Sequence, residues 1–293
     1  MEYGKSDKIG KILRNWQSLS DQIDPDFHQL LCSHAVPGLL EEVKNQGIIK
    51  EVDKNRPPMV LLACFPRSAS TYTFQVASDL FKLQKYHLWY ARGMSDYNLY
   101  LPRILSALQK RVISQQHIKA NYANIELIKY FDIKTIVLIR NIFDVIASKY
   151  KAEINKGEGA SIMGFMIHES KRESVMDMVI DTFLPWYLDF YVSWMWYIEI
   201  REIEAVVINY SELMHNQIKY FSRISKYLNE PRTDEEIEHS IRTIVNSKNH
   251  RLSDGKRESG LSLLQDYQIE KIRALGTRYA GYYDWIDMSP LGL

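Results

Sequence analysis

A short apolar run that leads directly into a hydroxyl-rich turn is the feature that most constrains how this chain folds. Met59–Phe65 contains no charged or strongly polar residue, which is typical of a strand buried on both faces of a sheet. The turn Pro66-Arg67-Ser68-Ala69-Ser70-Thr71-Tyr72 follows, and a helical pattern extends from Ser68 to Leu83. A strand, a tight turn and a helix in this order predict one unit of an α/β sheet.

The same order recurs along the chain. Lys134–Ile139 is a second strong strand candidate, and a helix is predicted through Asp144–Tyr150. Glu204–Asn209 is the last convincing strand, while His87–Tyr90 and Ile113–Lys119 are weaker candidates. Strands that alternate with helices pair in parallel through right-handed crossovers, so we predict a three-layer α/β/α fold with a central parallel sheet of about five strands. Ligands of such sheets bind beyond the carboxyl ends of the strands.

The region before the first strand has a different character. Residues 8–50 show the helical spacing of apolar residues, and Asn55-Arg56-Pro57-Pro58 then interrupts the pattern. We therefore predict an N-terminal helical segment, residues 1–56, that packs on a core domain formed by residues 57–293.

Charge and composition narrow the classes of partner. The formal net charge is +1, so no global attraction draws the chain to nucleic acid or to an anionic membrane, and a polyanionic ligand needs a local site. The most apolar long stretch, Val175–Ile200, contains four acids and Pro185. Acids are costly in a membrane span, so this pattern favours a mostly buried helix of a soluble protein.

The cysteines and the N-terminus bear on location. Cys32 and Cys64 have no metal-ligand spacing, and Cys64 lies in an apolar run, as expected of a buried thiol in a reducing compartment. Residues Met1–Asp7 are polar and show no signal peptide. We expect a cytoplasmic protein.

The turn after the first strand has the composition of an anion site. Backbone N–H groups and the positive end of the helix point at a ligand there, Arg67 adds a charge, and Ser68, Ser70 and Thr71 add hydroxyl donors. The glycines and the Lys-Ser/Thr pair of G-x-x-x-x-G-K-[ST] are missing, so the turn predicts a phosphate cradle that works without a metal ion. An ordinary helix N-cap beside a surface arginine is the alternative interpretation.

A second turn of this kind follows Lys134–Ile139. It reads Arg140-Asn141-Ile142-Phe143-Asp144-Val145-Ile146-Ala147-Ser148. An arginine at a strand end and a serine two helical turns later suit a second phosphate, because a guanidinium offers a fork of donors. Asp144 can cap the helix or orient Arg140. Taken alone, the turn is better explained as a helix cap.

Together, the two turns resemble the sulfotransferases that depend on 3′-phosphoadenosine-5′-phosphosulfate (PAPS). The family's 5′-phosphosulfate loop P-K-S-G-T-T-W is matched by Pro66–Tyr72, and its 3′-phosphate motif R-N-P-x-D-x-x-x-S by Arg140–Ser148 with the spacing intact. Trp186–Trp194 is similar to the family's long helix, Asn209–Leu213 to its Y-E-D-L signature, and Lys256–Gly260 to its basic, glycine-containing loop. The resemblance covers residues 59 to about 275. It implies a P-loop-like fold, PAPS as cofactor with no metal required, and a small-molecule acceptor.

The resemblance also implies a role for each matching residue. The 5′-phosphosulfate would be held by Arg67, Ser68, Ala69, Ser70, Thr71 and Tyr72, with Tyr72 stacking near adenine. Arg140 and Ser148 would hold the 3′-phosphate, and Tyr210 would contact adenine. Lys256, Arg257 and Gly260 would form the closing loop, although its glycine spacing differs from R-K-G-x-x-G. Ala69 replaces a glycine, which is acceptable only if φ stays below zero there.

The general base is the main departure from the family. Its K-T-H-L segment aligns with Lys119-Ala120-Asn121-Tyr122, and the amide of Asn121 cannot take a proton from an alcohol. His117 is the nearest substitute, but in a continued strand it lies roughly 13 Å back from Asn121 at ~3.3 Å per residue. Glu153 is plausible because related branches use glutamate. The remaining candidates are Asp96, His168 and Glu169.

The implied mechanism is in-line displacement at sulfur by an oxygen or nitrogen of the acceptor, with adenosine 3′,5′-bisphosphate (PAP) leaving. Arg67 would neutralise the leaving phosphate, and Lys119 would face the sulfuryl oxygens. We predict that residues 89–102 and 157–186, which are rich in aromatic residues and acids, form a pocket for a flat or cationic acceptor, such as a natural product. The whole interpretation requires Arg67 and Arg140 to lie at neighbouring edges of one sheet.

Two alternatives remain open. One is a protein that binds PAPS or PAP without catalysis, which Asn121 favours. The other is a P-loop nucleotide kinase, which the missing Lys-Ser/Thr pair opposes. The oligomeric state is not predicted.

Overall fold

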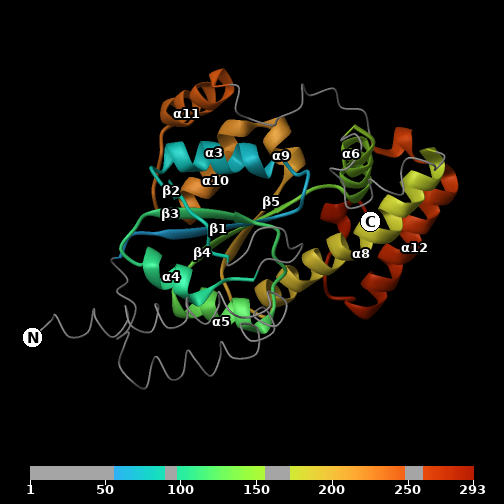
Figure 1. Cartoon of the computed structure of the whole chain (residues 1–293), viewed down its shortest axis with the longest axis horizontal. Helices are drawn as coiled ribbons and strands as arrows, with labels where there is room; N and C mark the ends of the chain where they lie inside the picture. The colour runs from blue at the N-terminus through green and yellow to red at the C-terminus, as the bar shows by residue number, and fades with distance from the viewer. Residues whose placement is uncertain (1–55, 90–97, 156–171, 248–259) are drawn as a thin grey trace, which may run out of the picture.

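The central sheet is parallel and has five strands. A computed structural model describes residues 56–89, 98–155, 172–247 and 260–293. The strand order is β2-β3-β1-β4-β5, and every neighbouring pair is parallel (Figure 1). The strands are β1 (Met59–Cys64), β2 (Gln84–Lys85), β3 (Val112–Gln116), β4 (Lys134–Ile139) and β5 (Ala205–Asn209). The predicted fold with about five parallel strands is confirmed.

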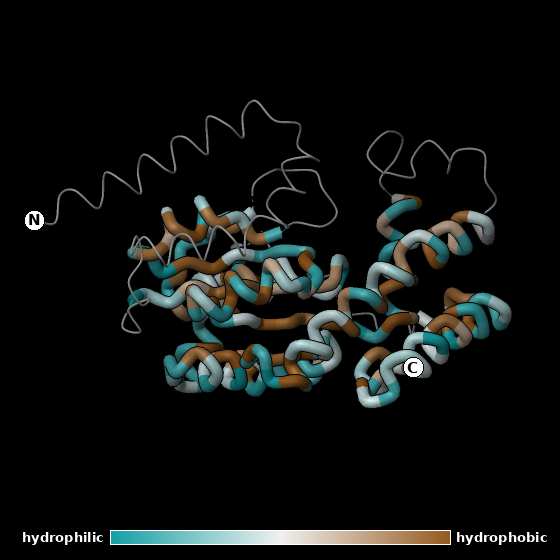
Figure 2. The backbone as a smooth tube through the Cα atoms, turned by 90° about the horizontal axis from the view of Figure 1, so that it is seen from below, coloured by the Kyte–Doolittle hydropathy of each residue, from teal (hydrophilic) through white to brown (hydrophobic). Residues whose placement is uncertain are grey.

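β1 shows why a continuous apolar run forms the middle of this sheet. All six of its residues are buried. Met59, Leu61 and Ala63 belong to one hydrophobic cluster, and the three residues between and after them belong to another. Successive side chains of a strand point to opposite faces, so a strand covered on both faces must be apolar at every position. Figure 2 shows brown stretches of the backbone in the middle of the molecule, whereas the helices around them alternate between brown and teal.

Helices cover both faces of the sheet (Figure 1). Residues of α3, α10 and α11 pack into the cluster that contains Val60, and residues of α4, α5 and α8 into the cluster that contains Met59. The longer helices are α3 (Ser70–Leu80), α5 (Tyr122–Tyr130), α6 (Ile142–Asn155), α8 (Arg172–Glu199), α10 (Gln217–Tyr227), α11 (Asp234–Asn246) and α12 (Asp266–Tyr282). The short ones are α4 (Leu101–Ala107), α9 (Tyr210–His215), η1 (Gly260–Leu263) and η2 (Ser289–Leu291).

Three of the four acids inside the apolar helix α8 contact α12. The pairs are Asp177 with the Tyr267 hydroxyl (2.8 Å), Asp181 with the Lys271 ammonium (2.6 Å) and Asp189 with the Tyr279 hydroxyl (2.6 Å). Because the partners follow the same order along both helices, α8 and α12 run in parallel. The predicted buried helix is therefore one half of a helix pair, and its acids serve that pair. Among the described helices, none is long and apolar enough to span a membrane.

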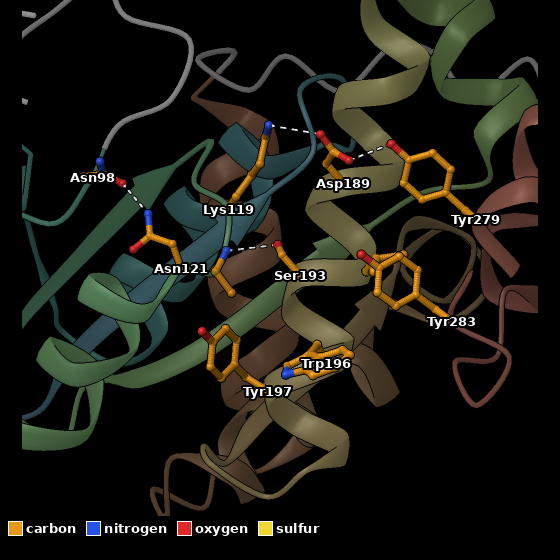
Figure 3. A pocket seen from close by; sticks show the side chains of 11 residues that line it. Asn98, Lys119, Asn121, Asp189, Ser193, Trp196, Tyr197, Tyr279 and Tyr283 are labelled. Carbon is orange, nitrogen blue, oxygen red and sulfur yellow. Dashed lines mark hydrogen bonds and ion pairs between the residues drawn. The ribbon is translucent and has the colours of Figure 1, made fainter. Parts of the chain in front are cut away.

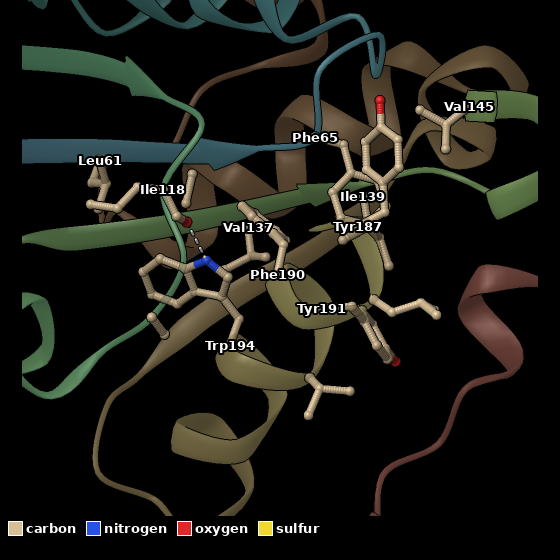
Figure 4. Packing of buried hydrophobic residues seen from close by; sticks show 14 of the residues in the cluster. Leu61, Phe65, Ile118, Val137, Ile139, Val145, Tyr187, Phe190, Tyr191 and Trp194 are labelled. Atoms are coloured by element: carbon tan, nitrogen blue, oxygen red, sulfur yellow. Dashed lines mark hydrogen bonds between the residues drawn. The ribbon is translucent and has the colours of Figure 1, made fainter. Parts of the chain in front are cut away.

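The aromatic residues of α8 hold the two segments that follow β1 and β3 (Figure 4). The ring of Phe65 lies 4.8 Å from that of Tyr187 and 5.0 Å from that of Phe190, measured between centroids. The Tyr187 hydroxyl donates to the Pro66 carbonyl at 3.3 Å. The indole N–H of Trp194 donates to the Ile118 carbonyl at 2.9 Å. α8 therefore positions the edge of the sheet where ligands are expected.

Two strand predictions need correction. β3 ends at Gln116, three residues before the predicted end, so residues 117–121 leave the sheet. The strand predicted at His87–Tyr90 is wrong, because β2 is formed by Gln84 and Lys85. β2 is a short exposed edge strand, so it lacks the apolar pattern by which buried strands are recognised. The helical segment predicted for residues 1–56 lies almost wholly outside the described residues and stays a prediction.

Candidate functional site

The turn after β1 contains two left-handed residues. Arg67 has φ of 68° and Ala69 has φ of 61°. Ser68 between them is fully buried, and its hydroxyl donates to the Phe65 carbonyl at 2.7 Å. The condition that would make alanine acceptable at position 69, a φ below zero, is not met, because the chain turns into α3 through a conformation that suits glycine. Left-handed residues between ordinary ones can turn successive backbone N–H groups toward one concavity, which favours an anion.

The turn after β4 contacts the turn after β1. Arg140 donates through Nη1 to the Arg67 carbonyl at 2.8 Å, and Arg67 donates through Nε to the Ser148 hydroxyl at 3.3 Å. The Arg140 guanidinium also lies 4.2 Å from the centre of the Tyr210 ring. Residues from three separate motifs therefore meet at the carboxyl edge of β1, β4 and β5.

Arg140 carries a donor without an acceptor. Its Nε is buried and finds no hydrogen-bond partner among the described residues. Burial is the main cause that lowers the pKa of Arg140, and the charge of Arg67 lowers it further. Tyr210 and Asp144 act in the opposite direction. A buried guanidinium N–H without an acceptor is unfavourable, and an anionic ligand would supply the acceptor. The residues present here therefore fit a phosphate group.

The remaining residues of the first turn differ in accessibility. Ser70 is buried and its hydroxyl accepts from the Gln115 amide at 2.9 Å, whereas Thr71 is half-buried. Tyr72 is fully buried and donates to the Gln217 side chain at 2.6 Å. Stacking of Tyr72 on adenine does not fit this arrangement, because its ring packs in the core against Phe221.

Gly260, the last residue of the predicted closing loop, contacts α6. Its N–H donates to the Asp144 carboxylate at 2.7 Å, so Asp144 holds this glycine. A Cβ atom at position 260 would lie 2.3 Å from the carbonyl oxygen of Phe143, so only glycine allows this approach. Lys256 and Arg257, which were predicted to close the site, lie outside the described residues.

Asn121 serves as a helix cap. Its side-chain oxygen accepts from the Asn124 N–H at 2.9 Å at the start of α5, and its amide group donates to Asn98 at 3.0 Å. Lys119 also has a partner, since its ammonium lies 3.4 Å from the Asp189 carboxylate. The continued strand that was assumed from His117 to Asn121 is wrong, because β3 has already ended at Gln116.

His117 lies directly after β3 and beside β1. Its Nδ1 is 2.9 Å from the carbonyl oxygen of Cys64, the last residue of β1. A carbonyl can only accept, so Nδ1 carries the proton and Nε2 keeps its lone pair. Burial is the main cause that lowers the pKa of His117; the bond to Cys64 opposes this shift, and the charge of Lys149 adds to it. The ring is therefore neutral near pH 7 and able to accept a proton.

Glu153 is buried on α6 and paired with Lys149. Their carboxylate and ammonium lie 2.6 Å apart, and the Glu153 side chain is 2% exposed. The Lys149 ammonium also lies 4.1 Å from the centre of the Phe183 ring. The carboxylate of Glu153 is therefore already engaged by an ammonium group. The other base candidates, Asp96, His168 and Glu169, lie outside the described residues.

A pocket of about 720 Å³ opens between the segment after β3, α8 and the end of α12 (Figure 3). Its described lining consists of Asn98, Lys119, Ala120, Asn121, Asp189, Val192, Ser193, Trp196, Tyr197, Tyr279 and Tyr283. Of these, only Asn98 comes from the two segments predicted to form the acceptor pocket; large parts of those segments lie outside the described residues.

Sequence reasoning missed two residues of this region. Lys149 follows Ser148 directly, but the motif places no requirement on its position. Tyr279 lies far along the chain, and no local pattern distinguishes it from other helical tyrosines. Both become relevant only through the packing of α6 and α12 against their neighbours.

The fold and the two joined turns define an α/β protein of the P-loop-like type. A family model described as a sulfotransferase domain matches residues 39–257, and the chain therefore belongs to this family. Comparison with curated protein sequences gives no match.

Two solved structures share the fold. The first is the mouse sulfotransferase SULT7A1 complexed with PAP, with a TM-score of 0.56 and 14% identity over 78% of this chain and 88% of that chain. The second is retinol dehydratase in complex with androsterone and the inactive cofactor PAP, with a TM-score of 0.56 and 13% identity over 77% of this chain and 81% of that chain. Identities this low support the fold alone.

Proposed function

We propose that this protein transfers the sulfuryl group of PAPS to a hydroxyl or nitrogen of a small-molecule acceptor. The observation that carries the proposal is the contact between the two turns, in which Arg140 binds the Arg67 carbonyl and Arg67 binds Ser148. Two adjoining anion sites suit a nucleoside bisphosphate. Both solved structures described above contain PAP.

PAPS, when bound, supplies the activated sulfuryl group. The backbone N–H groups and Arg67 of the first turn would hold its 5′-phosphosulfate, and Arg140 with Ser148 would hold the 3′-phosphate. Tyr210, whose ring lies under the Arg140 guanidinium, would contact adenine. Lys256 and Arg257 are proposed to add the closing positive charge. These residues position and neutralise the ligand, which is what in-line group transfer requires.

His117 is the general base that we favour. Its neutral ring, with Nδ1 bound to the Cys64 carbonyl, leaves Nε2 to accept the acceptor's proton. Glu153 is the second candidate, although Lys149 already holds its carboxylate. Asn121 is excluded from proton transfer because an amide is not basic. We propose a cytoplasmic location, since Cys64 is a free buried thiol.

Binding of PAP tests the cofactor site. We expect Arg140→Met to weaken PAP binding about 10- to 100-fold in calorimetry with EDTA present, because a hydrogen bond to a charged group contributes about 1.5–3 kcal/mol. Arg140→Lys keeps the positive charge but lacks the paired N–H donors of the guanidinium, so its affinity for PAP should be intermediate. Arg242→Met is the control, because Arg242 is an exposed residue of α11. Unchanged PAP affinity in Arg140→Met would overturn the assignment.

Turnover of PAPS tests transfer separately. Release of PAP is measured with phenols, alcohols and amines as acceptors. PAP binding without any turnover of PAPS would support the alternative of a non-catalytic PAPS-binding protein. Magnesium-dependent turnover of ATP would instead support a nucleotide kinase.

A further inference from the structure

The pocket beside α8 carries one positive and one negative charge. Lys119 and Asp189 are the only charged residues of its described lining, so the formal charges of that lining cancel. The Lys119 ammonium lies 3.4 Å from one carboxylate oxygen of Asp189, and the Tyr279 hydroxyl donates to the other at 2.6 Å. The three groups form a chain across the pocket wall (Figure 3).

This charge pair is accessible from the pocket. The side chain of Lys119 is 29% exposed and that of Asp189 is 45% exposed. Burial is the main cause that raises the pKa of Tyr279, and the bond to Asp189 raises it further, so the phenol keeps its proton and donates. A ligand in the pocket therefore meets an ordered, neutral pair.

Aromatic residues form the rest of the wall. Trp196, Tyr197 and Tyr283 line the pocket, and the rings of Trp196 and Tyr283 lie 6.1 Å apart between centroids (Figure 3). Such faces favour contact with a flat aromatic ring. An aliphatic ligand would gain less from this wall.

Short chain connections join the pocket to the proposed transfer site. Lys119 follows His117 by two residues, and Asp189 follows Tyr187, which binds the Pro66 carbonyl, by two residues. The Ala120 N–H donates to the Ser193 hydroxyl at 3.1 Å, which ties this segment to α8. The segments that line the pocket therefore also contact the end of β1 and the turn that follows it.

We propose that this pocket binds the acceptor and selects an uncharged aromatic molecule, with Lys119 and Asp189 as the residues that determine specificity. The inference rests on the proposed sulfuryl transfer and names its acceptor class. A cationic ligand is attracted by Asp189 but repelled by the ammonium of Lys119 at almost the same distance. An anionic ligand is attracted by Lys119 and repelled by Asp189 in the same way. An uncharged ring is repelled by neither group. The earlier expectation of a flat or cationic acceptor is thereby narrowed to a flat, neutral one.

Three probes with one ring system test the selection. They are 2-naphthol, its 6-aminomethyl derivative, which is a cation, and its 6-carboxylate derivative, which is an anion. Affinities are measured by quenching of tryptophan fluorescence with the protein saturated by PAP. We expect the protein to bind 2-naphthol about 10-fold more tightly than either charged probe. Tighter binding of a charged probe would overturn the inference.

Charge-removing variants make the test specific. Lys119→Met leaves Asp189 alone and should shift the preference toward the cation, whereas Asp189→Asn should shift it toward the anion. The double variant should again prefer the neutral probe. PAP binding by each variant confirms that it is folded. If the single variants change the affinity for all three probes by the same factor, the pair does not select by charge.

A matched pair of tyrosines tests the wall. Tyr283→Leu should weaken binding of all three probes about 10-fold, whereas Tyr282→Leu should leave it unchanged, because Tyr282 is 84% exposed and does not line the pocket. Equal effects of the two variants would contradict the assignment. If PAP binds and no probe does, this inference fails while the proposed function stands; if PAP does not bind, the proposed function fails first.

Discussion

Ala69 places an ordinary residue in a backbone conformation that glycine adopts freely. Its φ of 61° lies in the left-handed region, which costs an L-residue about 1–2 kcal/mol. The strain sits in the turn proposed to hold the phosphosulfate. Strain of this kind persists only where the surrounding structure enforces it, and here β1 and α3 fix both ends of the turn.

Replacement of Ala69 by glycine should relieve this strain. We expect Ala69→Gly to raise the free energy of unfolding by about 0.5–1 kcal/mol, less than the full strain because glycine also loosens the unfolded chain. Denaturant unfolding measures the change. The control is Ala77→Gly in the middle of α3, which should lose about 1 kcal/mol or more. A loss of stability in both variants would show that position 69 is not strained.

The protonation state of His117 should set the acid limb of the pH profile. Burial lowers the pKa of His117 below its ordinary 6.5, and only the neutral ring can accept a proton. We therefore expect kcat/KM to be level near pH 7 and to fall only as the pH drops below 6.5. His117→Ala should lower kcat about 10²–10⁴-fold, and the fall of kcat/KM at acid pH should disappear.

The control for His117 is His239→Ala, an exposed histidine of α11, which should keep both the rate and the profile. An unchanged acid limb in His117→Ala would move the role of base to Glu153.

At the scale of elements, α8 organises the candidate site. Its aromatic residues hold the segments after β1 and β3, and its acids hold α12 in parallel. Contacts of one helix with three segments therefore determine where the anion site and the pocket lie relative to each other.

Gly260 couples η1 to the start of α6. We expect Gly260→Ala to lower the free energy of unfolding by about 1–3 kcal/mol, because the new Cβ would meet a backbone oxygen that has little room to move. PAP binding should weaken with it, since α6 begins beside Arg140. Calorimetry and denaturant unfolding measure both effects.

The matched control is Gly281→Ala near the end of α12, where a Cβ has no neighbour within 4 Å. There alanine should gain up to about 1 kcal/mol by its higher helix propensity. If Gly260→Ala leaves both the free energy of unfolding and PAP binding unchanged, the close contact with Phe143 contributes to neither.

At the scale of the whole molecule, a chain of net charge +1 brings two arginines together at one edge of its sheet. Parallel strands all end at the same edge, so Arg67, His117, Arg140 and Tyr210 come together although they are far apart in sequence. A local anion site of this kind is compatible with a nearly neutral surface elsewhere.

Strands β1, β4 and β5, the two turns and the family were predictable from the sequence, because their signals are local. A strand buried on both faces must be apolar at every position, as in Met59–Cys64 and Lys134–Ile139. The order of charged and hydroxyl residues in the two turns identified the sulfotransferase family, which the match over residues 39–257 confirms.

Only the tertiary structure decided which side chains face one another. The sequence already excluded Asn121, at the position of the family's base, because an amide cannot take a proton. The structure adds that β3 ends at Gln116, so Asn121 caps α5 while His117 binds the end of β1. Tyr72 fits the motif of a residue that stacks on adenine, but the packing of α3 against α10 buries it. The pair of Asp189 with Tyr279 depends on the parallel docking of α8 and α12. Such contacts depend on how helices and strands pack against one another, and a local pattern of residue types does not determine that packing.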